Sequence, residues 1–194
     1  MGMVRKLFLL PFIVLAFQLG CKAPPTGAST PAGSTNQPVY HAHALLFDLL
    51  GDEKNVSKLL IIKRERAELK ALINEISQRT GKAHKELEEF AKSDRSLNLK
   101  DMGLPAAEVL TRKAIAKTRA KELLTESGKD FELHLLLAQN EALTYGGHLA
   151  TIAANSDTVT NRHQMLQQLS TDILQLQRKT VEMLLKNYTW PTNK

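Results

Sequence analysis

The segment VSKLLIIKRERAELKALINEISQRTGKAHKELEEFAKS, residues 56–93, decides the fold class. Its apolar side chains recur at intervals of three, four or seven residues, at Leu59, Ile62, Leu69, Ile73, Ile76, Ala83, Leu87 and Phe90. Because a helix turns about every 3.6 residues, this repeat predicts one long amphipathic helix with a narrow apolar seam. Arg66 and Thr80 interrupt the seam, and we expect the helix to bend at Gly81.

Further helices are predicted on both sides of this segment. Between Val39 and Trp190 the only proline is Pro105, and the stretches between glycines are rich in residues that favour helix. The spacing predicts a short helix over 41–51 and long helices over 105–125, 131–154 and 161–187. Pro105 suits the first position of its helix. No segment has the alternation that is typical of a strand.

These lengths predict an all-α fold, a four-helix bundle. Four long helices joined by short loops pack in this way, and Gly146-Gly147 is expected to kink one of them. Two alternatives stay open. The helix over 105–126 has a thin apolar stripe and would then dock only loosely, or the helix over 56–93 would pair with a second copy of the chain as a coiled coil.

The first twenty residues predict a secretory signal peptide. Residues 1–6 hold two basic side chains and no acid, and the apolar run over 7–19 is shorter than the about 20 residues of a membrane-spanning helix. Gly20 precedes Cys21, the only cysteine of the chain. Its position resembles the acceptor cysteine of bacterial lipoproteins, which takes a diacylglycerol. The alternative is an ordinary secreted protein cleaved near Ala23.

The residues after Cys21 predict a disordered tether. The range 22–37 is rich in proline, glycine, serine and threonine, so it has too little apolar surface to form a core. The predicted parts are therefore a signal over 1–20, a tether over 21–38 and a helical domain over 39–194. Several acyl chains hold a protein firmly on a membrane. Lys22 favours the outer membrane, facing the periplasm, by analogy with other lipoproteins.

The charge of the chain is mildly positive after export. Removing 1–20 takes two of the 26 basic residues, which leaves 24 against 20 acidic ones, a charge of +4. The densest basic cluster is Arg112, Lys113, Lys117, Arg119 and Lys121. We interpret it as a solvated face, with contact to anionic headgroups or peptidoglycan carboxylates as the alternative. An exported, tethered domain without a basic-aromatic groove is not expected to bind nucleic acid.

Three stretches carry a family resemblance. They are GKAHKELEEFA over 81–91, MGLP over 102–105 and LTESGKDFE over 124–132. Together they resemble a bacterial exported family of unknown function, often assigned to the outer membrane, with a ferritin-like helical domain. Its pattern has Asp-His-x-Lys in one helix, a Leu-Pro loop, then Gly-x-x-Phe-Asp opening the next helix. The resemblance spans roughly 56–187 and implies a ferritin-like fold.

The histidines of that family are mostly missing from this chain. Ala83 occupies the position of the Asp before His84, and Leu143 falls where the second histidine is expected, with His148 one turn away. The last family motif, Leu-Pro-x-Leu-x-x-His, aligns with 169–175 and lacks both its proline and its histidine. The resemblance therefore implies the fold and not a histidine site.

Catalytic and metal chemistry have little support in the sequence. A carboxylate-bridged di-iron site needs Glu-x-x-His pairs, and no glutamate has a histidine three residues later. The chain has no Gly-x-Ser-x-Gly motif and no phosphate-binding glycine loop. We therefore predict no catalytic residue, no metal ligand and no cofactor. The pairs Asp52-Glu53 and Glu88-Glu89 are interpreted as exposed charges.

The histidines are interpreted mainly as structural. His134, Glu141 and His148 lie seven residues apart on one predicted face, beside its apolar stripe, so boundary positions are favoured over metal ligands. We expect a local hydrogen bond at His84. We expect His41 and His43 to form an exposed His-x-His pair, and His163 to lie near the start of a helix.

The sequence thus predicts a lipid-anchored cell-envelope protein that is not an enzyme. Its expected role is a binding or structural module, with an envelope protein or a second copy of the chain as partner and the membrane reached through Cys21. The first alternative is a periplasmic stress protein that binds a metal or small ligand through His84, His134, Glu141 and His148. The second is a self-associating, coiled-coil-like structural protein.

Overall fold

The computed structural model describes residues 37–188, and no strand occurs in that range. Every described residue belongs to one compact unit, Ser34–Lys194. The predicted signal peptide, Cys21 and almost all of the predicted tether lie outside the described residues. The all-α prediction is confirmed for the part that the structure describes.

The described residues form six α-helices and one short 3₁₀ helix. In chain order they are α1 Gln37–Glu53, η1 Val56–Lys58, α2 Leu59–Ile62, α3 Ala67–Ser93, α4 Ala106–Thr125, α5 Gly128–Ser156 and α6 Thr160–Asn187. None of these helices combines the length and the apolar content that crossing a bilayer requires.

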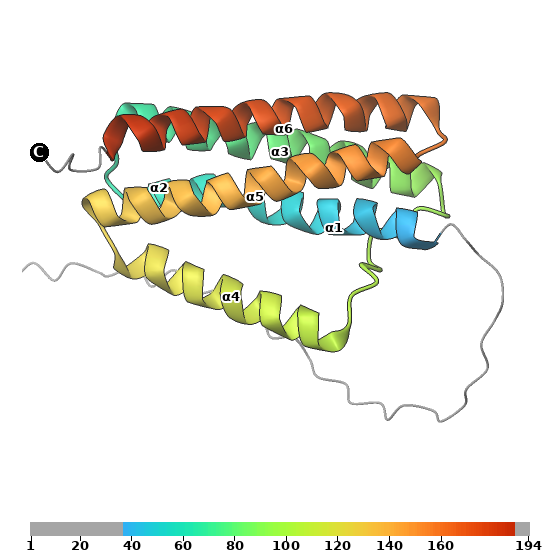
Figure 1. The fold of residues 1–194 in the computed structure, drawn as a ribbon, viewed down its shortest axis with the longest axis horizontal. Coiled ribbons are helices and arrows are strands. Elements are labelled where there is room, and N and C mark those ends of the chain that lie inside the picture. The colour runs from blue at the N-terminus through green and yellow to red at the C-terminus, as the bar shows by residue number, and fades with distance from the viewer. Residues whose placement is uncertain (1–36, 189–194) are drawn as a thin grey trace, which may run out of the picture. The chain divides into compact units, whose positions relative to one another are not determined.

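Four helices, α1, α3, α5 and α6, lie side by side around one apolar core (Figure 1). The core side chains follow the spacing of three and four residues on each helix, so each apolar stripe turns toward the same centre. The largest fully buried side chains are Phe131, Leu46, Leu50, Leu69, Ile73, Ile76, Leu87, Leu135, Leu136, Leu143, Leu166 and Ile173. The seam predicted for 69–87 is thus buried within the chain, where a second copy has no access to it.

Gly146 and Gly147 let α5 approach two neighbours closely, and α5 continues as helix through both. A Cβ atom at Gly146 would lie 2.7 Å from Cδ2 of Leu49 on α1, and one at Gly147 would lie 2.6 Å from Cδ2 of Leu174 on α6. Both distances are shorter than van der Waals contact. The pair that suggested a kink serves instead for close packing.

The prediction of one helix over 56–93 is wrong at its N-terminal third. The chain is extended at Lys63, with φ −116° and ψ 137°, and again at Arg66, after which α3 begins. No glycine or proline lies in that stretch, so the break has a tertiary cause. The Lys63 ammonium donates to the carbonyl oxygens of Leu124, at 2.9 Å, and Glu126. Ile62, a predicted seam residue, is consequently exposed.

The structure also differs in which helices share the core. The short helix expected over 41–51 is the 17-residue α1, and it takes the core position expected for the helix over 105–125. That helix, α4, lies outside the other four and diverges from α5 away from the turn that joins them (Figure 1). Leu123 is its only buried residue. The alternative of a loosely docked helix is the one that the structure adopts.

Hydrogen exchange is expected to separate α4 from the core. Because α4 buries one side chain, we expect its amides to exchange through local opening, at a free energy well below global unfolding. Amides of α3 and α5 should exchange only with global unfolding. The variant Leu123→Ala should lower protection in α4 alone, whereas Ile73→Ala should lower global stability by about 2–5 kcal/mol. Equal protection of α3 and α4 in the native chain would contradict the loose docking.

Candidate functional site

His84 lies at the interface of α1 and α3. Its ring stacks on Phe47, with 4.0 Å between ring centroids, and the Lys54 ammonium lies 3.2 Å from Nε2. Burial and the Lys54 charge lower the pKa of His84, which favours the neutral form of the imidazole. The expected local hydrogen bond within its own helix is replaced by this contact with α1.

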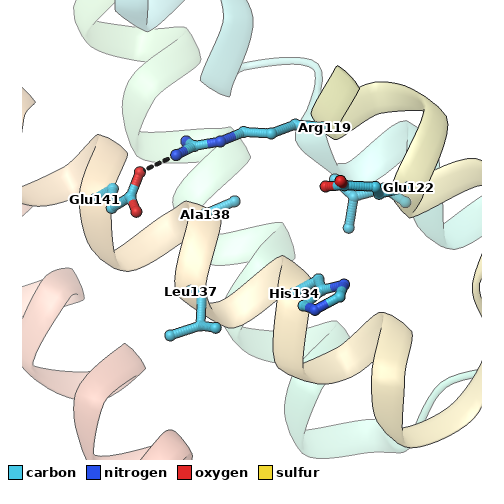
Figure 2. A pocket seen from close by; sticks show the side chains of 7 residues that line it. Arg119, Glu122, His134, Leu137, Ala138 and Glu141 are labelled. Atoms are coloured by element: carbon cyan, nitrogen blue, oxygen red, sulfur yellow. Dashed lines mark hydrogen bonds and ion pairs between the residues drawn. The ribbon is translucent and has the colours of Figure 1, made fainter. Parts of the chain in front are cut away.

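His134 and Glu141 lie on the side of α5 that faces α4. Nδ1 of His134 is 2.6 Å from Oε2 of Glu126, and Arg119 on α4 pairs with Glu141. Between the two helices is a small, open cavity of about 120 Å³ (Figure 2). The residues that line it are Arg119, Glu122, Leu123, His134, Leu137, Ala138 and Glu141. Figure 2 shows Arg119 reaching toward Glu141 along one side of this cavity.

The four residues of the metal hypothesis do not come together. His84 contacts α1, His134 and Glu141 face α4, and His148 is exposed on α5. Within residues 37–188, no group of three or more His, Asp, Glu or Cys side chains is arranged to hold a metal ion. The residues of the metal hypothesis are thus dispersed among the described helices.

The remaining histidines have structural partners. Nδ1 of His163 lies 2.7 Å from the Ala154 carbonyl oxygen, so it satisfies an acceptor in the last turn of α5. His41 lies 3.8 Å from Asp101 and packs on Gly103, whose φ of +62° and contact with the His41 ring both exclude a side chain. The prediction that His43 is exposed is wrong, because its side chain has no accessible surface.

A buried polar group, the Asp157 cluster, joins one end of the four core helices. It consists of His43, Asp94, Asp157 and Arg162. Nε2 of His43 lies 2.9 Å from Asp157, and Arg162 donates to Asp157 and, at 2.9 Å, to Asp94. Burial opposes ionisation of Asp157, but hydrogen bonds from Arg162, the Val159 amide and His43 lower its pKa.

Asp94 has the stronger shift in this cluster. Hydrogen bonds from Ser96 and then from Arg162 lower the pKa of Asp94 to about 2. The cluster therefore consists of ionised carboxylates around one buried guanidinium. The side chains of His43 and Asp157 have no accessible surface, so a substrate cannot reach them. We assign the cluster to stability.

A second polar group, the Arg66 cluster, joins the opposite end. Arg66, directly before α3, pairs with Glu132 on α5 and donates to Oδ1 of Asn187 on α6 at 3.0 Å. Asn187 also donates to Glu132 at 3.1 Å. Because these contacts join three helices, Arg66 fixes where α3 begins. Thr80, the other interruption of the seam, donates to the Ile76 carbonyl within its own helix.

Glu53 is half-buried, with its Oε2 atom inaccessible to solvent, and the prediction of an exposed charge is wrong for it. Burial raises the pKa of Glu53 to about 7, against a hydrogen bond from Gln139 that lowers it. Among the described residues, Oε2 of Glu53 and Oε1 of Gln139 are buried without a hydrogen-bond partner. Protonation of Glu53 turns its buried, unpaired Oε2 atom from a charged acceptor into part of a neutral carboxylic acid. This preference for the protonated form agrees with the raised pKa of Glu53.

The sequence contained a signal for two of these buried residues. His43 and Glu53 fall on the same helical stripe as Leu46 and Leu50, at spacings of three, four and three residues. A polar residue on an apolar stripe is buried when a partner exists. The partners, Asp157 and Gln139, come from distant segments, so the sequence alone does not identify them.

The accessible chemistry gathers where α4 meets α5. Besides Leu123, polar contacts with α5 hold α4: Arg112 donates to the Tyr145 hydroxyl at 3.1 Å, and Arg119 pairs with Glu141. Exposed pairs of this kind stabilise by about 0–1 kcal/mol each. Helix α4 is therefore the least firmly held of the long described helices and the candidate functional element.

No family model, curated protein or solved structure matches this chain.

Removing the buried guanidinium is expected to cost stability. The variant Arg162→Ala leaves Asp157 and Asp94 without their partner, so we expect a loss of about 3–5 kcal/mol in the free energy of unfolding. Arg178→Ala, an exposed change on the same helix, is the matched control and should alter stability by less than about 0.5 kcal/mol. Urea unfolding measures both. Equal midpoints for the two variants would refute the role of the Asp157 cluster.

Stability is expected to fall as Glu53 ionises. Its folded-state pKa of about 7 lies above the ordinary 4.5, so the folded protein binds this proton more tightly than the unfolded chain. The stabilisation is complete below pH 4.5 and is lost as the pH rises through 7. Glu53→Gln has no group that ionises at this position. Between about pH 5 and pH 8, its free energy of unfolding should therefore fall by roughly 2–3 kcal/mol less than that of the native chain.

The control for this titration is Glu89→Gln, an exposed change on α3. Urea unfolding at several pH values should give Glu89→Gln the same pH dependence as the native chain. Parallel stability curves for the native chain and Glu53→Gln would mean that Glu53 does not carry the buried proton.

Proposed function

We propose that this chain is a lipid-anchored, non-catalytic binding module of the bacterial cell envelope, with α4 as its recognition element. The observation that carries the proposal is the exposure of α4. This helix buries one side chain and leaves the leucines at 110 and 124 exposed by 67% and 50%. A helix of 20 residues that adds so little to the core is available for a partner.

The fold part of the proposal is a ferritin-like four-helix bundle. It is supported by the shared core of α1, α3, α5 and α6 and by the family resemblance over 56–187. In this proposal α4 is an addition to the bundle rather than one of its four helices. The dispersed histidines support a role without a bound metal.

The anchoring part of the proposal depends on the first 21 residues. A signal peptide followed directly by the sole cysteine supports lipidation at Cys21, with export to the periplasmic side of the outer membrane. The described domain then works at a membrane surface. The most buried ion pairs of this domain, in the Asp157 cluster, are closed to solvent. In this proposal the side chains that remain accessible bind a partner and do not catalyse a reaction.

A second candidate function is small-ligand binding in the cavity between α4 and α5. The polar groups around that cavity favour it, since Arg119, His134 and Glu141 could orient a small polar molecule. Its volume of about 120 Å³ is well below the roughly 300–1,000 Å³ of typical ligand pockets, so only a very small ligand fits. Native mass spectrometry of the chain purified without chelator separates the candidates, because a bound metal or ligand adds mass.

Replacing the cysteine tests the anchor. We expect Cys21→Ser to abolish incorporation of a labelled fatty acid and to move the protein from the membrane fraction to the soluble periplasmic fraction, since no other thiol can accept a lipid. Thr26→Ser, a conservative change in the predicted tether, is the control and should retain label and location. Unchanged labelling of Cys21→Ser would overturn the anchored module.

A further inference from the structure

The side of α4 that points away from α5 has a distinct composition. We call this side the outer face of α4, and it consists of Ala107, Leu110, Ala114, Lys117, Lys121 and Leu124. These residues recur at three and four residues and all are exposed. The contacts with α5 described above, by contrast, are made by polar residues and Leu123. The exposed apolar side chains of α4 thus cannot be explained by its docking.

The outer face is basic and carries no carboxylate. Over its 20 residues α4 has five basic and two acidic side chains. Glu108 is engaged with Arg112 at 2.8 Å, and Glu122 lies beside the α4–α5 cavity. Lys117 and Lys121 have no ion-pair partner among residues 37–188. A surface of lysines between two leucines is complementary to an anionic, partly apolar partner.

The N-terminal end of α4 lies beside the entry of the chain into the helical unit. Gly103, three residues before α4, packs on His41, which lies in the first turns of α1. The predicted anchor, Cys21, is 16 residues before the first residue of α1. Sixteen residues extend to at most about 55 Å. An anchored chain therefore keeps α4 within reach of the bilayer.

We propose that the outer face of α4 binds the anionic phospholipid headgroups of the membrane that holds the chain. The inference rests on the proposed anchoring function, and it identifies the membrane surface itself as the partner that α4 binds. Each lysine near an anionic surface contributes about 1 kcal/mol, and Leu110 and Leu124 add contact with the headgroup and acyl boundary. The interaction is weak alone, but tethering raises the effective concentration of the surface.

A second copy of the chain fits this surface poorly. Two outer faces brought together would oppose lysine with lysine, and no carboxylate on either face would compensate. An acidic protein has the complementary charge, so it is the competing partner. Vesicle binding without any protein partner distinguishes it from lipid.

The test uses the unit Ser34–Lys194, which lacks the anchor and contains every described core residue. It is mixed with vesicles of phosphatidylglycerol and phosphatidylcholine, or of phosphatidylcholine alone, and separated by flotation. We expect binding to the anionic vesicles only, weakening as salt is added. Circular dichroism and a thermal melt confirm that each protein is folded.

Charge reversal locates the surface. The double variant Lys117→Glu/Lys121→Glu should lower the partition coefficient about tenfold or more. Lys82→Glu/Lys85→Glu, on the exposed side of α3, changes the net charge equally and should lower it much less. Leu110→Ser/Leu124→Ser should weaken binding with the charge unchanged.

Three results would overturn the inference. They are no binding of the native unit to anionic vesicles, equal binding to neutral vesicles, and equal losses from the α4 and α3 charge variants. None of these depends on Cys21, because the unit lacks it. Failure of fatty-acid labelling would instead overturn the anchor, so the two proposals fail separately.

Discussion

The close packing of α5 is the constraint on which the rest of the structure depends. Gly146 and Gly147 admit Leu49 of α1 and Leu174 of α6 so closely that a Cβ atom at either glycine would force the facing leucine side chain to shift. With two sides of α5 thus occupied, its remaining side is left for α4. Because that side presents His134, Glu141 and Tyr145, α4 docks through polar contacts and contributes little to the core.

Helix content and the main seam could be predicted because they depend on local spacing. The run of buried side chains from Leu69 to Leu87 follows directly from its periodicity. The break before α3 could not be predicted, because the partners of Lys63 and Arg66 lie far along the chain. The place of α1 in the core could not be predicted for a related reason. Its apolar stripe includes His43 and Glu53, whose partners come from distant segments.

Polar residues divide into two kinds in this fold. The Asp157 and Arg66 clusters lie at opposite ends of the core, where they fix the start and end of helices. A separate group of exposed polar and basic residues lies on α4, at its junction with α5 and on its outer face. Sequence spacing favoured boundary positions for His134 and His148, and the fold pairs His134 with Glu126 and leaves His148 exposed. The outer face of α4 is a basic helical surface beside the entry of the chain.

The most direct measurement is paramagnetic relaxation enhancement from gadolinium-bearing lipids in anionic vesicles, observed on the backbone amides of Ser34–Lys194. If α4 is the recognition element, signals of Leu110, Lys117 and Lys121 lose the most intensity, and those of α3 and α6 lose little. An effect spread evenly over the chain, or strongest at Ile61 and Ile62, would contradict that role, since both isoleucines are exposed outside α4.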